Sequence, residues 1–247
     1  IEGDHVGFNT EEALFDCFKL SLYYTKQWFK EVHLVTDIKG KALIEKHGLK
    51  FDKIDIGLEA LKGIDKIHWA LGKIYACKIQ DKPFIHIDND VIWFKKPPLK
   101  ILTAEAAFQN IECKSLINWY SLLLNDAQDN YKNKPEWFNC KDFKAYNCGI
   151  IAFNKLDFLS EWWEEALKYI SYLRNDCFVE YGQEITSLIF EQFVVYHLCR
   201  YYNYDVRVLS LKTHITEEVA IELGYTHLIS GSKRDHKVEL KVKNRLK

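Results

Sequence analysis

The chain has 247 residues, of which 48% are hydrophobic and 28% are charged, with 11 glycines and 4 prolines. This composition is typical of a globular protein with a sizeable core, and it excludes collagen-like, disordered and low-complexity chains. Lysine plus arginine (34) nearly balance aspartate plus glutamate (35), so the formal net charge of -1 gives no global attraction for nucleic acid, and no nucleic-acid partner is expected.

The first half of the chain alternates helix-like and strand-like segments. Thr10 and two glutamates precede a periodic apolar stretch, which predicts a capped helix. The expected order is helix 10–29, strand 32–35, helix 40–46, strand 51–56, helix 67–79 and strand 84–87. Such alternation predicts an α/β fold with a mostly parallel sheet, in which ligands bind beyond the carboxyl ends of the strands.

The second half of the chain is less regular. The pattern predicts strand 106–111, helix 115–124, a long loop over 125–146, strand 148–153, helices 158–172 and 184–201, strand 206–209 and a short strand 227–229. Long loops in compact domains are often functional. The aromatic residues of this loop either stack on the rings of a ligand or cover the core; they are Tyr131, Trp137, Phe138, Phe143 and Tyr146.

The chain shows no sign of a linker, a membrane span or a disulfide framework. We therefore expect one domain over residues 1–247, without a transmembrane segment. The seven cysteines are odd in number, widely spread and never in a C-x-x-C pair, which favours reduced thiols in the cytoplasm and argues against a zinc site. Residues 1–10 lack a signal-peptide pattern, and the absence of methionine leads us to expect that natural residues are missing from this chain.

The sharpest feature is a pair of carboxylates, Asp88 and Asp90, directly after the apolar strand 84–87. Two carboxylates in such a place are costly unless a cation or a basic partner accompanies them. Oxygen ligands suit Mg²⁺ or Mn²⁺, which in turn suit phosphate oxygens. A structural alternative is that the pair caps the next element or pairs with Lys95 and Lys96.

This segment resembles the D-x-D motif of GT-A glycosyltransferases, and more narrowly bacterial sugar transferases with W-x-x-G-K … P-F-x-H-x-D-x-D. The matching residues are Trp69, Gly72, Lys73, Pro83, Phe84, His86, Asp88 and Asp90. The resemblance implies a GT-A type α/β fold, with a mostly parallel central sheet flanked by helices. It divides the chain into a Rossmann-like nucleotide-binding half, 1–93, and an acceptor and metal-completing half, 94–247.

The segment 226–234 resembles the H-x-x-G-x-x-K stretch of glycogenin-like transferases. In that family the histidine completes the metal site and the glycine and lysine hold the diphosphate, which implies these roles for His227, Gly231 and Lys233. The spacing here is H-x3-G-x-K, so the phosphate contact is left open. Chemically the set is sensible, because imidazole ligates Mn²⁺, glycine lets backbone N–H groups approach phosphate and lysine supplies a charge.

Two further segments resemble the same families. Asn147 and Gly149 match an N-x-G strand in which the asparagine reaches the sugar and the glycine leaves room for it; the alternative is a turn before a strand. Glu191 and Gln192 match a D/E-Q pair near the donor sugar or acceptor; the alternative is a solvated helix face, and Glu184 competes for the role. The resemblance thus implies catalytic roles for Asn147, Glu191 and Gln192.

The remaining donor-binding residues follow from their places in the chain. Thr36 and Asp37 end a strand where these folds bind the base or ribose, and Trp69 and Asn89 belong to the matched motifs. Lys73 reaches the diphosphate or is a surface lysine of an amphipathic helix.

The resemblance implies a metal-dependent glycosyltransferase. It would use Mn²⁺ or Mg²⁺ to move a sugar from a nucleotide-diphosphate sugar, with UDP favoured, to a hydroxyl of a saccharide or glycolipid acceptor. Retention of configuration and a role in surface polysaccharide or glycolipid synthesis follow family habit. The basic tail 233–247 either makes peripheral contact with anionic lipid or is a solvated end.

Two other classes compete with this interpretation. A HAD-type phosphohydrolase also opens with an apolar strand and D-x-D, with Asp88 as nucleophile, but its motif sits on the first strand and needs a downstream acidic pair that we do not find. A non-catalytic sugar- or nucleotide-binding module would have no need of a full set of Asp88, Asp90, His227 and Lys233.

Overall fold

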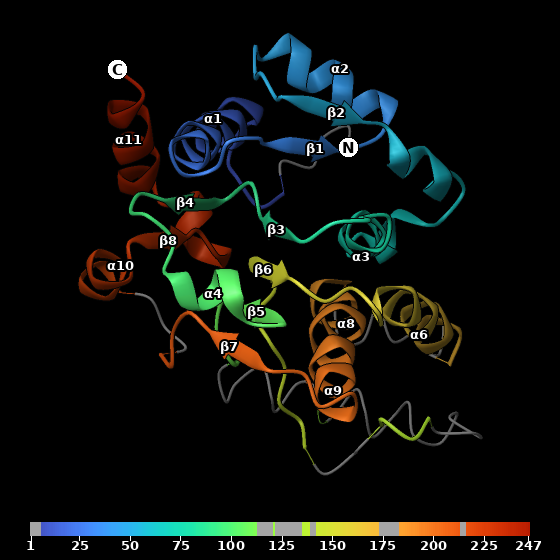
Figure 1. Ribbon diagram of the computed structural model, residues 1–247. Coiled ribbons are helices and arrows are strands. Elements are labelled where there is room, and N and C mark those ends of the chain that lie inside the picture. The colour runs from blue at the N-terminus through green and yellow to red at the C-terminus, as the bar shows by residue number, and fades with distance from the viewer. Residues whose placement is uncertain (1–5, 113–120, 122–134, 139–141, 173–182, 213–215) are drawn as a thin grey trace. The chain divides into compact units, whose positions relative to one another are not determined.

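The protein is α/β, with helices and short strands alternating along much of the chain (Figure 1). The computed structural model describes residues 6–112, 121, 135–138, 142–172, 183–212 and 216–247. The chain forms two compact units, described separately below. Unit 1 comprises residues 1–59, 87–98 and 215–247, and unit 2 comprises 60–86 and 99–214, so each unit takes segments from both sequence halves. The organisation as one domain stays a prediction.

Unit 1 contains two small sheets and the helices that pack on them. Strands β1 and β2 are parallel, whereas β4 and β8 are antiparallel. Helix α1 begins as predicted at Thr10, whose side chain accepts a hydrogen bond from the Ala13 N–H at 3.1 Å. The elements are α1 (Glu11–Trp28), β1 (His33–Val35), α2 (Ile38–Lys46), β2 (Lys53–Asp55), β4 (Val91–Trp93), α10 (Glu217–Leu223), β8 (Tyr225–His227) and α11 (His236–Arg245).

Helix α1 organises the core of unit 1 because it buries two faces. One face packs with β4 and α11, which lies beside it in Figure 1, through Leu20, Ile92 and Val242. The other face packs on the β1–β2 sheet and α2, through Phe15 and Ile44. Burial of such side chains contributes about 1.5–3 kcal/mol each. The basic tail contacts α1 through Val242, while most of its residues are exposed, as in a solvated end.

Unit 2 is built around a sheet with the strand order β3-β6-β5-β7. Strand β5 pairs antiparallel with β6 and parallel with β7. Helices α3, α6 and α9 enclose an aromatic-rich core on this sheet. The elements are α3 (Leu71–Lys78), β3 (Phe84–Ile87), α4 (Leu99–Thr103), β5 (Ala106–Phe108), β6 (Ile150–Phe153), α6 (Leu159–Tyr172), α8 (Gln183–Leu188), α9 (Val194–Tyr201) and β7 (Val206–Val208), with short 3-10 turns at Gly57–Leu61 and Lys66–His68.

The sheets are mixed rather than mostly parallel, which corrects the sequence prediction. Regular helix–strand alternation ends near residue 87, and the later strands β6 and β8 pair antiparallel with β5 and β4. Strand β4 and helices α4, α10 and α11 were not predicted, because their apolar patterns are short or, in α11, diluted by charge. The predicted helix 115–124 lies outside the described residues apart from residue 121, as does most of the loop 125–146.

The described aromatic residues of the 125–146 segment cover the core. Trp137, Phe138 and Tyr146 are buried, and the Trp137 indole N–H donates to Glu165 Oε2 at 3.1 Å. Tyr131 lies outside the described residues. Phe143 is partly buried and packs against the same core, so core cover is the role of the described rings. The cysteines that the structure describes are likewise buried thiols: Cys17, Cys77, Cys148 and Cys199.

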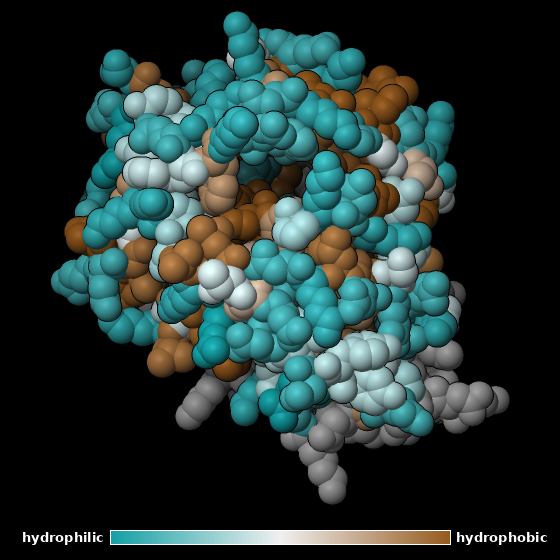
Figure 2. Space-filling model, viewed as in Figure 1, coloured by the Kyte–Doolittle hydropathy of each residue, from teal (hydrophilic) through white to brown (hydrophobic). Residues whose placement is uncertain are grey.

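The surface in the view of Figure 2 is mostly hydrophilic, and hydrophobic residues form separate patches on it. Within the described ranges, no helix is both long and apolar enough to cross a bilayer.

Gly224 at the C-cap of α10 has to be glycine for two reasons. Its φ is +81°, and a Cβ there would lie 2.5 Å from Lys95 Cβ. We expect Gly224→Ala to lower the free energy of unfolding by about 3 kcal/mol, from left-handed strain plus overpacking. Urea unfolding checks this. Gly48→Ala is the matched control, because its φ is +70° but no atom lies within 4 Å of the added Cβ, so about 1 kcal/mol is expected. Equal losses in the two variants would contradict the steric argument.

His197 makes the stability of the protein depend on pH. Burial lowers its pKa from 6.5 to about 4, although a hydrogen bond to the Asp142 carbonyl, at 2.9 Å, and the charge of Asp142 act in the opposite direction. The unfolded chain therefore binds an extra proton between pH 6.5 and 4, and stability falls as the pH falls through this range, by about 3 kcal/mol. Urea unfolding at pH 7 and pH 4.5 should show a smaller loss for His197→Gln than for the wild type. Parallel losses would contradict the assignment.

Candidate metal centre

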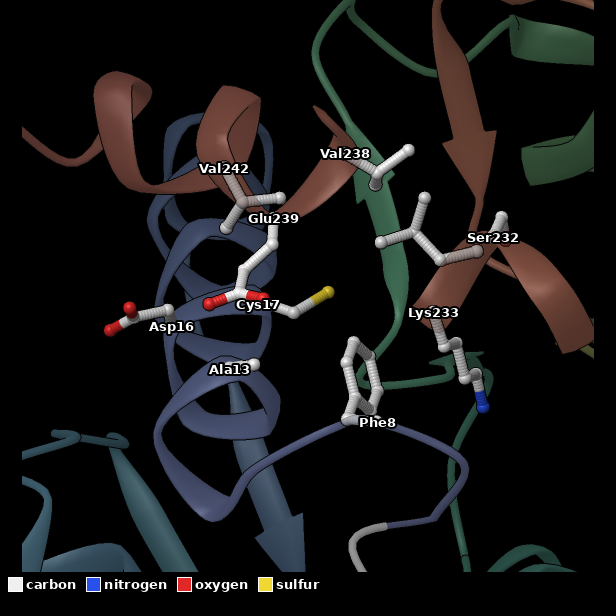
Figure 3. A pocket seen from close by; sticks show the side chains of 10 residues that line it. Phe8, Ala13, Asp16, Cys17, Ser232, Lys233, Val238, Glu239 and Val242 are labelled. Carbon is white, nitrogen blue, oxygen red and sulfur yellow. The ribbon is translucent and has the colours of Figure 1, made fainter. Parts of the chain in front are cut away.

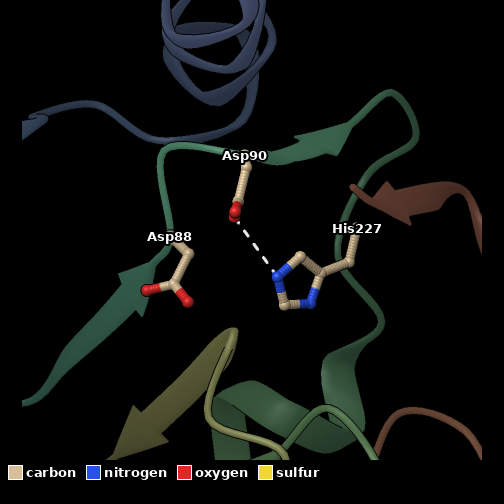
Figure 4. Close-up of side chains that lie close together, drawn as sticks. All are labelled: Asp88, Asp90 and His227. Atoms are coloured by element: carbon tan, nitrogen blue, oxygen red, sulfur yellow. Dashed lines mark ion pairs between the residues drawn. The ribbon is translucent and has the colours of Figure 1, made fainter. Parts of the chain in front are cut away.

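Asp88 and Asp90 lie in a tight turn between β3 and β4 (Figure 4). The Val91 N–H donates to the Asp88 carbonyl at 3.0 Å, which closes the turn and projects both carboxylates from a short loop. Cys17 of α1 supports the turn from behind, since its thiol contacts the Asn89 carbonyl at 3.8 Å. Burial, reinforced by the negative charge of Asp90, raises the pKa of Cys17 to about 12, so the thiol stays protonated as a donor.

Strand pairing brings His227 to this turn. In the antiparallel pair β4–β8, His227 lies opposite Val91, and the Leu228 N–H donates to the Asp90 carbonyl at 3.0 Å. The His227 Nε2 atom is 3.2 Å from Asp90 Oδ1, and the ring faces both carboxylates in Figure 4. One ligand atom each from Asp88, Asp90 and His227 lie within 4.8 Å of one another.

The three side chains fit a divalent cation. Two ligand atoms on one ion, each about 2.0–2.2 Å from it, lie no more than about 4.4 Å apart. The ligand atoms here lie within 4.8 Å of one another, so they need to approach one another only slightly to bind a single ion. Asp90 Oδ1 is buried and, among the described residues, accepts no hydrogen bond of good geometry. Two carboxylates and one imidazole form a mixed oxygen and nitrogen set of the kind that Mn²⁺ accepts, and Mg²⁺ less readily.

Lys233 contributes a fixed positive charge to the same cluster. It lies on a 3-10 turn, Ser230–Arg234, directly after β8, and its Nζ is 2.7 Å from Asp90 Oδ2. Burial raises the pKa of Asp90, but His227 and Lys233 outweigh burial and the nearby charge of Asp88, so the net shift is downward. Asp90 is therefore ionised at neutral pH. The alternative partner Lys95 instead donates to the Ile221 carbonyl.

The segment 6–9 holds Lys233 in place from the other side. Its Nζ donates to the Val6 carbonyl at 3.1 Å and lies 5.4 Å from the centre of the Phe8 ring. Figure 3 shows that the stem of Lys233 lines a small apolar pocket with Phe8 and Cys17, while its amine points away. The pocket has a volume of about 10 Å³, room for about one water, so it is a packing gap rather than a ligand cavity.

Gly231 stands in open space on the same 3-10 turn. A Cβ at Gly231 would meet no atom within 4 Å. The positive φ of this turn, 48°, belongs to the preceding residue, Ser230. No packing within the described residues therefore requires a glycine here, which is the expected situation if a ligand approaches the backbone.

We predict that Gly231→Ala leaves the free energy of unfolding within about 0.5 kcal/mol of the wild type but weakens diphosphate binding about tenfold. The added methyl group enters space that a phosphate would need, and it meets nothing in the protein itself. Isothermal titration with a nucleoside diphosphate and Mn²⁺ checks the prediction. An unchanged affinity would contradict a backbone contact at Gly231.

Thr36 and Asp37 have clear structural roles in unit 1. The Thr36 N–H donates to the Asp55 carbonyl at 2.8 Å, and Asp37 Oδ1 caps α2 by accepting from the Gly40 N–H at 2.6 Å. Gly40 is required by this close approach, because a Cβ would lie 2.1 Å from Thr36 Oγ1. Helix α2 therefore begins two residues earlier than predicted, at Ile38.

The other predicted residues lie in unit 2, where Lys73 and Glu191 form a buried ion pair. Lys73 Nζ is 2.7 Å from Glu191 Oε1 and donates to the Cys148 carbonyl at 3.1 Å. Glu191 is 1% exposed, because α8 and α9 are joined through a π-helical turn, Ile189–Phe193. Neither a solvated helix face for Glu191 nor a surface position for Lys73 agrees with this placement.

The remaining predicted residues of unit 2 are Asn147, Gly149, Gln192 and Trp69. Asn147 is buried; its amide donates to Glu112 Oε1 at 2.8 Å and its Oδ1 accepts from the Gly149 N–H at 3.0 Å. This is the hydrogen bond of a turn before β6, as the backbone alternative predicted. Gln192 is buried, and Trp69 is 48% exposed.

Three groups that support the predicted site residues were not predicted from the sequence. Cys17 and the Val6 carbonyl support the metal centre, and Glu112 anchors Asn147. A thiol inside an apolar helix face and a main-chain carbonyl leave no sequence signal. Glu112 follows a predicted strand end, which was the one available hint.

The chain belongs to a family described as a family of unknown function (DUF6734), whose model matches residues 2–247. Searches of curated proteins and of solved structures gave no significant match.

Proposed function

We propose that the protein is a metal-dependent glycosyltransferase of GT-A type that moves a sugar from a nucleotide-diphosphate sugar to an acceptor hydroxyl. The observation that carries the proposal is the convergence of Asp88, Asp90, His227 and Lys233. The D-x-D turn and the His-Gly-Lys segment are distant in the sequence, yet β4–β8 pairing joins them. The resemblance implies one diphosphate site for both segments.

The cluster is suited to the charge that such a reaction develops. Departure of a nucleoside diphosphate leaves negative charge on its oxygens, and a divalent ion held by Asp88, Asp90 and His227 would stabilise that charge. Lys233 supplies a further positive charge, and the open backbone at Gly231 leaves room for a phosphate. A UDP-sugar donor, a saccharide or glycolipid acceptor, retention of configuration and action in the cytoplasm are parts of the proposal that rest on the resemblance.

Thermal unfolding with a panel of nucleoside diphosphates and their sugars, each with and without Mn²⁺, tests the proposal. A ligand at about 100 times its dissociation constant stabilises the native state by about 2.7 kcal/mol. We expect the nucleoside diphosphate of one base to stabilise the wild type only when Mn²⁺ is present. The same ligand should have no effect on Asp88→Asn. The matched control is Asp81→Asn, which removes an exposed carboxylate and should behave as the wild type.

Turnover then separates the competing classes. Release of the nucleoside diphosphate in the presence of saccharide acceptors supports the transferase. Donor binding without turnover in any acceptor mixture would indicate a binding module. Phosphate release from phosphomonoesters without nucleotide binding would make Asp88 a hydrolase nucleophile.

A further inference from the structure

A lysine already pairs with one of the two carboxylates of the candidate metal centre. Lys233 Nζ is 2.7 Å from Asp90 Oδ2, and both side chains are largely buried, with 13% and 8% of their surface exposed. The other oxygen of Asp90 faces His227 at 3.2 Å. An ion bound through Asp90 Oδ1 would therefore share this carboxylate with the ammonium group of Lys233, which pairs with Oδ2.

The charges of the cluster change sign when such an ion enters. Asp88, Asp90 and Lys233 together carry a formal charge of -1, and a divalent cation brings the total to +1 if Lys233 stays. Two cations within a few ångströms in a poorly solvated site repel one another strongly. An anion that contacts both the ion and the ammonium group removes this repulsion, as a diphosphate can.

We propose that Lys233 makes metal binding conditional on a diphosphate: the charge of the lysine beside Asp90 opposes the ion until the phosphates take up the ammonium group, and only then does the ion bind tightly. This inference rests on the proposed function. It identifies the diphosphate group, rather than the base or the sugar, as the ligand that loads the metal centre.

The structure provides the means for this exchange. Lys233 has a flexible four-carbon stem and an ammonium group with three donors, of which Asp90 and the Val6 carbonyl take two. The open space at Gly231 lies on the same 3-10 turn. A phosphate bound there would lie on the same turn as Lys233, two residues along the chain.

Mn²⁺ binding, measured from the electron paramagnetic resonance signal of the free ion, tests the inference on the full chain. We expect Lys233→Met to bind Mn²⁺ alone at least tenfold more tightly than the wild type, because the positive charge beside Asp90 is then gone. The matched control is Arg234→Met, which removes the neighbouring charge; Arg234 contacts the Gly7 carbonyl at 3.2 Å and should leave the affinity unchanged.

Inorganic pyrophosphate should raise the Mn²⁺ affinity of the wild type at least tenfold, after correction for the complex that the two form in solution, and should raise that of Lys233→Met much less. Mn²⁺ must raise the pyrophosphate affinity by the same factor. This wild-type coupling tests the inference even if the variant fails to fold. An unchanged Mn²⁺ affinity in a folded Lys233→Met, or no coupling in the wild type, overturns it.

The two failures are distinguishable. If a nucleoside diphosphate and Mn²⁺ together stabilise the wild type while Lys233→Met gains no Mn²⁺ affinity, the conditional mechanism is wrong and the proposed function stands. If neither the wild type nor Lys233→Met binds Mn²⁺, with or without pyrophosphate, the conditional mechanism and the proposed function are both wrong.

Discussion

Replacing Asp88 by asparagine is expected to lower transferase turnover by at least about 10³-fold while leaving the free energy of unfolding nearly unchanged. The amide keeps the shape of the side chain but removes a charge that the ion needs, and loss of several kcal/mol of transition-state stabilisation corresponds to this factor. Asp90→Asn should lose turnover equally but should also unfold more easily. It takes the carboxylate away from His227 and from Lys233, which are 3.2 and 2.7 Å from it.

The expected stability loss for Asp90→Asn is about 3 kcal/mol, at the low end for a broken buried pair because Lys233 remains 13% exposed. Urea unfolding of both variants without metal checks the difference, and Asp81→Asn again serves as the control. Two outcomes would contradict the picture: equal stabilities for the Asp88 and Asp90 variants, or Mn²⁺-dependent turnover that survives Asp88→Asn.

The cluster of possible metal ligands was largely predictable because its parts are short local patterns. An apolar strand followed by two carboxylates is visible in the sequence, and β3 ends directly before Asp88 as expected. The role of His227 as a metal ligand was inferred from a sequence resemblance. Strand β8 ends at this residue, whereas the predicted strand begins there. The pairing of Lys233 with Asp90 was not predictable, since it depends on the register of β4 against β8 and on the path of the following turn.

The fold was predictable only where elements are long and periodic. Helix α1 has a cap and an apolar face of its own, so its existence and its start follow from the sequence. Strand pairing is not local: β5 is flanked by β6 and β7, one antiparallel and one parallel, and no feature of the 106–108 segment specifies this. Helix α11 could not be predicted because most of its residues are charged or polar, and its buried face is confined to a few positions such as Val242.

The π-helical turn in unit 2 shows the same limit for function. Helix 184–201 was predicted as a continuous helix, and its existence is confirmed. The extra residue of the π turn changes which side chains face inward, so Glu191 lies in the core opposite Lys73 rather than on a solvated face. Such turns are frequent at functional sites, and the catalytic role that the resemblance implied for Glu191 stays a prediction.

The pair Lys73–Glu191 should behave as one energetic unit. Glu191→Met removes the anion 2.7 Å from a largely buried ammonium group and is expected to cost about 3–4 kcal/mol of unfolding free energy, whereas Lys73→Met is expected to cost about 3 kcal/mol. The double variant with methionine at both positions should recover most of the loss, because replacing a whole buried pair by apolar groups is often nearly neutral.

A double-mutant cycle by urea unfolding measures the coupling between the two positions, with Glu164→Gln on the exposed face of α6 as the control. Additive losses would show that the two charges act separately. If Glu191 also acts on the sugar or acceptor, the double variant regains stability but not turnover, whereas a purely structural pair regains both. Stability and turnover measured on the same three variants therefore separate the structural role of Glu191 from a catalytic one.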